Sequence, residues 1–228
     1  MFLRNMKTVS PYLTAIFLLH FLSACQAQHQ PEEKKQTATT SGHVGGPCED
    51  CDLMFVDIPA NIPSIDTSAG WTEPGTKLIV HGTVYKIDGK TPAPNVILYY
   101  HQTDNTGYYT PGGKQQGRGR RHGHLRGWIK TDENGHYSLY TVRPAPYPNA
   151  SIPAHIHFYI KEPDLPSEYW IDDITFDDDP LLTQKERDRQ PKRGGSGIVT
   201  VAKQSEMQVA THTIVLGLNI PNYPSDKQ

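Results

Sequence analysis

Residues 77–100 read KLIVHGTVYKIDGKTPAPNVILYY, and this stretch decides the class of fold. Residues 77–86 are rich in β-branched and aromatic side chains, which favour strands. The run stops at Asp88-Gly89, a pair typical of tight turns. Residues 95–100 then supply a second run of the same kind. The stretch therefore predicts two strands joined by a turn.

The same pattern of short strand-forming runs separated by turns continues along the chain. Further strands are expected at residues 127–130, 136–142, 154–161, 169–176, 197–202 and 210–218. No segment shows a sustained 3.6-residue apolar period, so long amphipathic helices are not expected. Many short strands at this spacing predict an all-β, two-sheet antiparallel β-sandwich over residues 71–220. Two long loops, 110–125 and 181–197, are either functional or simply solvated surface segments.

Composition narrows the class of partner. The 228 residues carry a formal net charge of −2, so no basic surplus directs the chain to nucleic acid. Glycine and proline number 19 each, which suits turns between short strands. The chain also contains 12 tyrosines and 11 histidines, all potential metal ligands.

The first residues have the pattern of a targeting segment. Arg4 and Lys7 precede a mostly apolar run at 13–22, which is too short to span a membrane. The run ends in Leu22-Ser23-Ala24-Cys25, which resembles a bacterial lipobox. That resemblance implies a signal peptide at 1–24, a lipid on Cys25 and an exported lipoprotein of the cell envelope. The alternative is an ordinary signal peptide with an incidental cysteine.

Residues 25–46 are polar and are expected to form a flexible tether, and residues 221–228 a short C-terminal tail. Between tether and sandwich, residues 47–70 form an extension that contains Cys48-Glu49-Asp50-Cys51. A CxxC pair can be redox-active, half of a zinc site or a structural disulfide. A zinc site needs a second pair, which the sequence lacks, and export favours a disulfide.

A set of tyrosines and histidines carries the candidate chemistry. In a strand, His155 and His157 project from the same face and can bind one ion. Just upstream, three prolines stiffen the segment that presents Tyr147. A glycine turn presents Tyr108 and Tyr109 after the strand at 95–100. Two phenolates with two imidazoles favour ferric iron over zinc or ferrous iron.

These residues resemble a known family. RGWIKTDENGHYSLYTVRPAPYPN at 126–149, followed by PAHIHF at 153–158, is similar to the core of the intradiol ring-cleavage dioxygenases. The resemblance covers about residues 75–220. It implies catalysis on a catecholic aromatic with dioxygen, at Fe(3+), giving a muconate-type diacid. The implied iron ligands are Tyr109, Tyr147, His155 and His157.

The resemblance also implies residue roles. Tyr109 is preferred to Tyr108 because the family's ligand follows a glycine with one residue between. A released tyrosine takes a substrate proton, and Tyr147 is assigned this catalytic role. Arg126 is a second catalytic candidate, with a structural salt bridge as the alternative. The basic loop at 118–124 either attracts an anionic substrate or is solvated.

Two positions depart from the family pattern. Ile152 stands where relatives often have arginine, and Asp173 stands near a place where relatives have glutamine. Residues 81–100 also resemble small carboxypeptidase-regulatory-like sandwich domains. A non-catalytic cell-surface binding or carrier module is therefore an alternative function, and a zinc hydrolase is a third.

Overall fold

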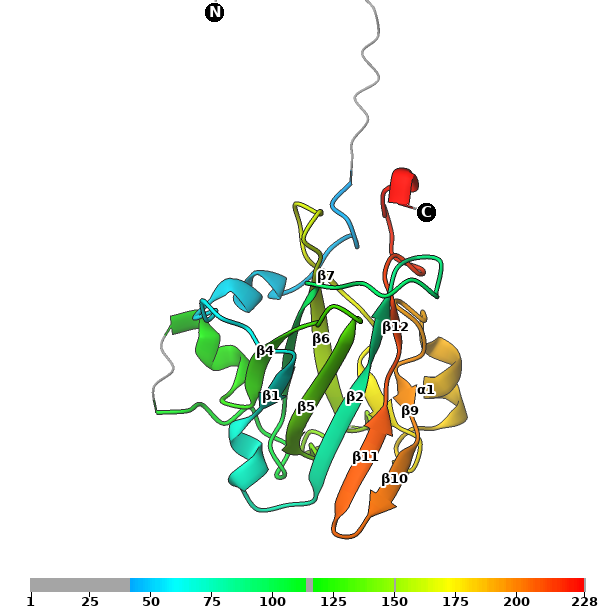
Figure 1. The fold of residues 1–228 in the computed structure, drawn as a ribbon. Helices are drawn as coiled ribbons and strands as arrows, with labels where there is room; N and C mark the ends of the chain where they lie inside the picture. Colours follow the sequence, from blue (N-terminus) through cyan, green and yellow to red (C-terminus); the bar gives the residue numbers. More distant parts are fainter. Residues whose placement is uncertain (1–41, 114–116, 150, 228) are drawn as a thin grey trace, which may run out of the picture. The chain divides into compact units, whose positions relative to one another are not determined.

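The computed structural model describes residues 42–113, 117–149 and 151–227. Two six-stranded sheets face each other across one core, which confirms the predicted all-β sandwich (Figure 1). The first sheet contains β1 (Ile65–Thr67), β5 (His136–Val142), β2 (Lys77–Tyr85), β11 (Met207–Thr211), β10 (Val201–Gln204) and β12 (Ile214–Val215). The second contains β4 (Arg126–Lys130), β3 (Ile97–Gln102), β6 (His155–Lys161), β8 (Ile174–Phe176), β9 (Ile198–Val199) and β7 (Tyr169–Trp170).

Alternation along the strands separates core from surface. On β2, Leu78, Val80 and Val84 are fully buried, while His81 is exposed. On β6, Ile156 and Phe158 face the core between the sheets. The period of two residues then turns His157 and Tyr159 to the opposite, outer face of the second sheet. The candidate ligands therefore lie outside the sandwich core.

The pairing of strands is mixed. The central pairs β2–β5, β3–β4 and β3–β6 are antiparallel as expected. The pairs β1–β5, β2–β11, β2–β12 and β8–β9 are parallel. Parallel neighbours need a crossover connection. These pairs therefore differ from the antiparallel pairs, joined by short turns, that the sequence predicted.

The run at 169–176 forms two short strands in place of the single one expected. Between them, the Asp172 carboxylate accepts hydrogen bonds from the backbone amides of Lys192 and Arg193, both at 2.9 Å. These contacts bend the chain toward the 181–197 loop, so the strand cannot continue. The sandwich also begins at β1, a few residues before the expected start at 71.

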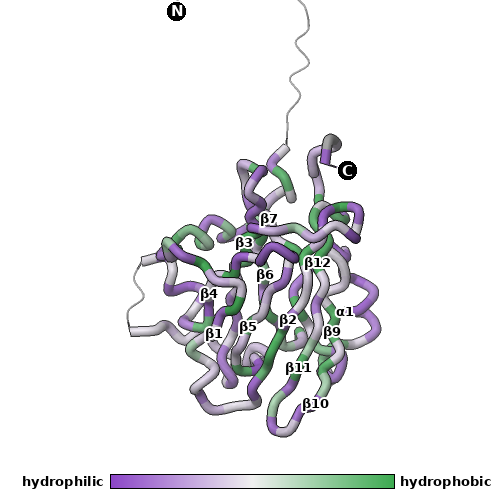
Figure 2. Tube along the Cα trace, in the orientation of Figure 1, coloured by the Kyte–Doolittle hydropathy of each residue, from purple (hydrophilic) through white to green (hydrophobic). Residues whose placement is uncertain are grey.

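The 181–197 loop contains the one α-helix of the described residues, α1 (Gln184–Arg189). Thr183 caps it by accepting a hydrogen bond from the amide of Glu186. None of its residues is buried, and it is hydrophilic along its length (Figure 2). Because the cap and not an apolar face defines this helix, hydrophobic periodicity did not reveal it.

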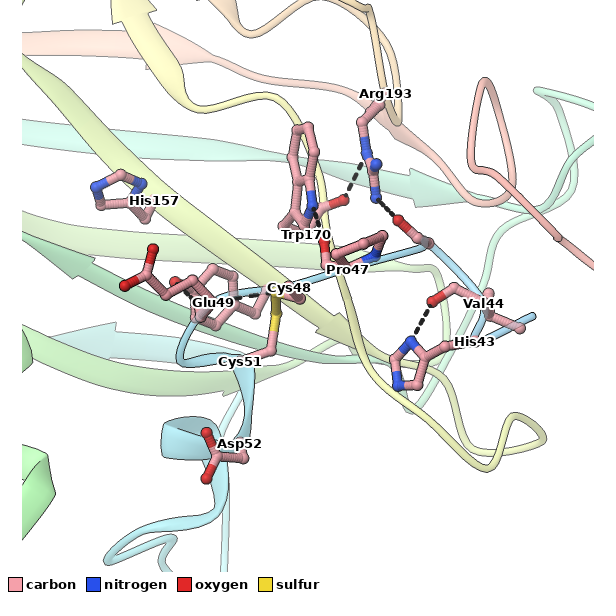
Figure 3. The surroundings of a disulfide bond; sticks show 12 residues. His43, Val44, Pro47, Cys48, Glu49, Cys51, Asp52, His157, Trp170 and Arg193 are labelled. Atoms are coloured by element: carbon pink, nitrogen blue, oxygen red, sulfur yellow. Dashed lines mark hydrogen bonds between the residues drawn. A yellow bond between two sulfur atoms is a disulfide. The ribbon is translucent and has the colours of Figure 1, made fainter. Parts of the chain in front are cut away.

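Short 3-10 turns complete the fold at η1 (Cys51–Phe55), η2 (Ala69–Thr72), η3 (Gly117–His122) and η4 (Ser225–Lys227). The predicted disulfide is confirmed, since Cys48 and Cys51 are joined. Beside the disulfide, the Trp170 indole donates to the carbonyl of Pro47 (Figure 3). The Arg193 guanidinium lies over the Trp170 ring, 3.4 Å from its centroid. With Met54, the cysteines pack against Tyr99 and Tyr159 on the outer face of the second sheet.

The predicted signal peptide, the lipid site at Cys25 and the tether up to residue 41 lie outside the described residues. The expectation of a flexible tether is wrong for residues 42–46, which contact the sandwich: Val44 is buried in the core, and the amide of Gly45 donates to the carbonyl of Pro221. Among the helices that the structure describes, none has the length and hydropathy needed to cross a membrane.

Candidate metal centre

The β6 histidines are fixed in orientation by their Nδ1 atoms. His155 Nδ1 lies 2.8 Å from the carbonyl of Pro153, and His157 Nδ1 lies 2.8 Å from Oδ1 of Asp173. Both acceptors require a proton on Nδ1, which leaves the Nε2 lone pair of each ring free to bind a metal. Strand periodicity predicted the common face of the two histidines. Their hydrogen-bond partners, Pro153 and Asp173, lie in the segments before and after β6.

Two loops bring the tyrosines together. The Asp104 carboxylate accepts hydrogen bonds from the amides of Thr106 and Tyr108, which fixes the turn before Tyr109. The Asp104 carbonyl then accepts from the amide of Ala145, which joins this turn to the proline-rich segment of Tyr147. Gly107 makes the approach possible, because a side chain there would collide with the Pro146 carbonyl.

The four predicted donors converge. The Tyr109 hydroxyl lies 2.8 Å from that of Tyr147 and 3.0 Å from Nε2 of His157. The Tyr147 hydroxyl lies 3.2 Å from Nε2 of His155. Two ligands bound at about 2.1 Å and at right angles stand about 3 Å apart. The spacing of these donors therefore fits one shared cation.

The electrostatics of the donor set fit a highly charged ion. Burial raises the pKa of Tyr109, and the neighbouring Tyr147 raises it further. Burial likewise raises the pKa of Tyr147 and lowers that of His155. The protein alone thus keeps all three groups neutral. A trivalent cation would reverse the effect for the phenols by direct attraction, so this donor set favours hard, strongly charged metals.

Asp173 gives the site a nearby negative charge. Partial burial opposes ionisation of its carboxyl, but His157 and His155 lower its pKa below the ordinary value. Together with the two histidines, Asp173 forms the one His/Cys/Asp/Glu group among the described residues that could hold an ion. Its hydrogen bond to Nδ1 of His157 also places it as an orienting residue behind that ring.

Other expected residues lie apart from the donors. The side chain of Tyr108 is exposed, and its hydroxyl has no partner among the described residues. Arg126 is bonded to Asp57 at 2.7 Å and to the Tyr99 hydroxyl at 3.5 Å. It contacts none of the four donors in the described chain, and its position matches the salt-bridge alternative.

The basic loop is attached to the CxxC extension. Arg118 forms ion pairs with Asp50 and Asp52, and Arg121 pairs with Asp50. These guanidinium groups are therefore occupied by the acids of the extension. The arrangement gives the loop a structural task and leaves no support for substrate attraction by these two arginines.

A column of rings behind His157 was not anticipated. His101 stacks on His157 at 4.4 Å and on His122 at 3.7 Å between ring centroids. His101 is buried, and burial lowers its pKa well below the ordinary value. Register explains the column, because His101 on β3 lies opposite His157 on β6. Alternation on β3 is the sequence signal that could have indicated it.

A cleft of about 420 Å³ opens beside the donors. Tyr147 lines it, and Tyr109 does not, so Tyr147 is the phenol nearer to an entering molecule. The remaining walls combine apolar and charged side chains, namely Ile152, Pro153, His155, His157, Trp170, Asp172, Asp173, Thr175, Leu182, Glu186, Arg189, Gln190 and Pro191.

Fold and site together define a β-sandwich protein with a candidate mononuclear centre of phenol and imidazole donors. The model of a dioxygenase family matches residues 59–188, more than half of the chain. The chain therefore belongs to the intradiol ring-cleavage dioxygenase family.

Two curated relatives are similar in sequence. Catechol 1,2-dioxygenase of Acinetobacter baylyi is 34% identical over 127 residues, covering 47% of this chain and 39% of that protein. Catechol 1,2-dioxygenase 2 of Acinetobacter lwoffii is 28% identical over 158 residues, covering 62% of this chain and 54% of that protein. The chain thus spans about half or less of the length of these relatives.

Solved structures agree on the fold. The dioxygenase domain of a dioxygenase carbohydrate-binding protein fusion from Streptomyces sp. SirexAA-E has a TM-score of 0.53 and 23% identity. The match covers 70% of this chain and 91% of that one. 3-Chlorocatechol 1,2-dioxygenase from Rhodococcus opacus 1CP has a TM-score of 0.52 and 21% identity, covering 70% and 68%.

Proposed function

We propose that this protein opens a catecholic ring between its two hydroxylated carbons, using dioxygen, and releases a muconate-type diacid. The site of reaction is a non-haem ferric iron held by Tyr109, Tyr147, His155 and His157. The observation that carries the proposal is the convergence of these donors, with successive contacts of 3.0, 2.8 and 3.2 Å. The relatives named as catechol 1,2-dioxygenases support the substrate class.

Ferric iron, when bound, would supply a Lewis acid that activates a chelated catechol toward dioxygen. The protein supplies position and proton transfer. Tyr147 lines the cleft, so its phenolate oxygen is placed to accept the proton of an entering catechol hydroxyl. Tyr109 does not line the cleft, so it would serve to hold the ion. Ile152, Leu182 and Trp170 offer apolar surface to the ring and displace water from it.

The alternative of a non-catalytic binding module is weaker on the same observation. A module that only holds a ligand has no need of two phenols and two imidazoles converging beside a cleft. The exported, lipid-anchored location stays part of the proposal. It rests on the sequence around Cys25.

The first prediction tests the ligands. Iron-loaded protein should show a visible absorption band, because a phenolate bound to ferric iron has a low-energy charge-transfer transition that imidazole lacks. Tyr109→Phe and Tyr147→Phe should each shift or weaken the band, since each removes a phenolate oxygen and keeps the ring. Tyr108→Phe is the matched control and should leave the band unchanged.

Oxygen uptake then tests the reaction. Catechol added without air should move the band, and admission of air should consume oxygen and yield the ring-opened diacid. A colourless protein that holds one iron by elemental analysis would refute the tyrosine ligation. A coloured protein whose band no catechol perturbs would refute the dioxygenase function and put the binding module ahead.

A further inference from the structure

The cleft beside the donors carries more acid than base. Among the residues that line it, Asp172, Asp173 and Glu186 stand against one arginine, Arg189. This imbalance has no part in the bonding of the metal site, except for the contact of Asp173 with His157. It bears instead on what else can occupy the cleft.

Most of these charges are already paired. The buried Asp172 accepts from two backbone amides at 2.9 Å. The Arg189 guanidinium lies 3.3 Å from the carboxylate of Glu186, so the two charges largely cancel within the cleft. The backbone amides are neutral, so they do not cancel the charge of Asp172. Both of its carboxylate oxygens are bonded to these amides, however, and do not face the open cleft.

Among these charged groups, Asp173 is the one whose charge can act on a molecule bound in the cleft. Its side chain is 39% exposed, and one oxygen, Oδ1, accepts from Nδ1 of His157. Within the described residues, Oδ2 has no hydrogen-bond partner. Asp173 lines the same cleft as Tyr147, His155 and His157, so its carboxylate offers an unused acceptor to a molecule bound there.

We infer that this cleft selects catechols by the charge of the ring substituent, favouring a cationic group and disfavouring a carboxylate. The inference rests on the proposed function. A catechol bound by its two oxygens at the donors leaves its substituent in the remaining cleft, between the apolar Ile152 and Leu182 and the carboxylate of Asp173. Apolar walls strengthen such charge interactions, because they lower the local dielectric.

The test compares three substrates of the iron-loaded full chain: dopamine, catechol and protocatechuate. At low salt, kcat/KM for dopamine should exceed that for protocatechuate by at least about tenfold, and salt should narrow the gap. Asp173→Asn should reduce the ratio by about tenfold. Asp188→Asn removes the same charge from an exposed position of α1 outside the lining and should keep the wild-type ratio.

A second pair of variants reverses the sign. Ile152→Arg places a cation in the lining at a side chain that is already 39% exposed. It should raise kcat/KM for protocatechuate relative to dopamine. Ile152→Met keeps an uncharged side chain of similar size and should leave the ratio as in wild type. This pair decides the inference if Asp173→Asn loses iron through its contact with His157.

A binding measurement separates the inference from the proposed function. Calorimetry compares tyramine with 4-hydroxybenzoate, two phenols that lack the second hydroxyl and are not cleaved. If no catechol is opened but tyramine binds more tightly in an Asp173-dependent manner, the charge selection stands and the proposed reaction fails. If catechols are opened while protocatechuate equals or exceeds dopamine, the charge selection is overturned and the reaction stands.

Discussion

At the scale of single residues, the four donors were predictable and their supports were not. The strand period put His155 and His157 on one face and the prolines suggested a rigid segment at Tyr147, while the family resemblance implied the full set of four. The choice of Tyr109 over Tyr108 agrees with the hydroxyl contacts of Tyr109. The ring stacked on His157 belongs to β3, and only the register between strands brings His101 there. Alternation on β3 could have indicated the face on which His101 lies, but its pairing with His157 is a long-range property that local patterns do not encode.

Gly107 provides a test at this scale. It has φ of +87°, and a Cβ at this position would collide with the carbonyl of Pro146. Gly107→Ala should therefore cost about 2 kcal/mol or more in unfolding free energy and weaken the iron band, because the segments of Tyr109 and Tyr147 must separate. Urea unfolding and absorption spectra of the iron-loaded protein measure the two effects.

The control for Gly107→Ala separates conformation from collision. Gly89 also has positive φ, +66°, but no atom lies within 4 Å of its Cβ position. Gly89→Ala should show only the cost of the backbone conformation, about 1 kcal/mol, and a normal iron band. Equal behaviour of the two variants would contradict the role given to the Gly107 contact.

At the scale of elements, local composition predicted the long strands and missed the short pieces. β2 and β5 fall where alternation is continuous. The break between β7 and β8 arises from the Asp172 carboxylate, which binds amides twenty residues further on. α1 is defined by a cap and one ion pair, and it has no apolar residue to produce a periodic signal.

The disulfide segment is the element with a direct prediction. Replacing both Cys48 and Cys51 by serine should lower the unfolding free energy by about 2 kcal/mol, the value for such a short closed loop. The iron band should persist, because none of the four donors lies in this segment. Thermal unfolding and absorption of the double variant measure both quantities. Loss of the band in the double variant would mean that η1 supports the donors through Tyr159 and His101.

At the scale of the whole molecule, the two sheets meet in a core that also holds a histidine. His212 lies between β11 and β12 and is fully enclosed. Its Nδ1 lies 2.9 Å from the hydroxyl of Tyr137, and that hydroxyl donates to the carbonyl of His212 at 2.8 Å. The imidazole therefore donates from Nδ1 to the hydroxyl oxygen of Tyr137. It contributes to the packing of the first sheet against Phe158 of the second.

Burial lowers the pKa of His212 to about 4 in the folded protein. The unfolded chain has the ordinary value of about 6.5, so it binds more protons between these limits. The stabilising contribution of His212 is thus fully present above pH 6.5 and is lost as the pH falls. The loss of unfolding free energy reaches about 3 kcal/mol by pH 4. Urea unfolding between pH 7 and 4 should show this slope of unfolding free energy against pH in wild type and a smaller slope in His212→Gln, whatever its stability at neutral pH.

Ile214→Val removes one methyl group from the same core, so it should lower stability at every pH and keep the wild-type slope. A slope in His212→Gln equal to that of wild type would show that other groups, and not this imidazole, couple the sandwich to pH.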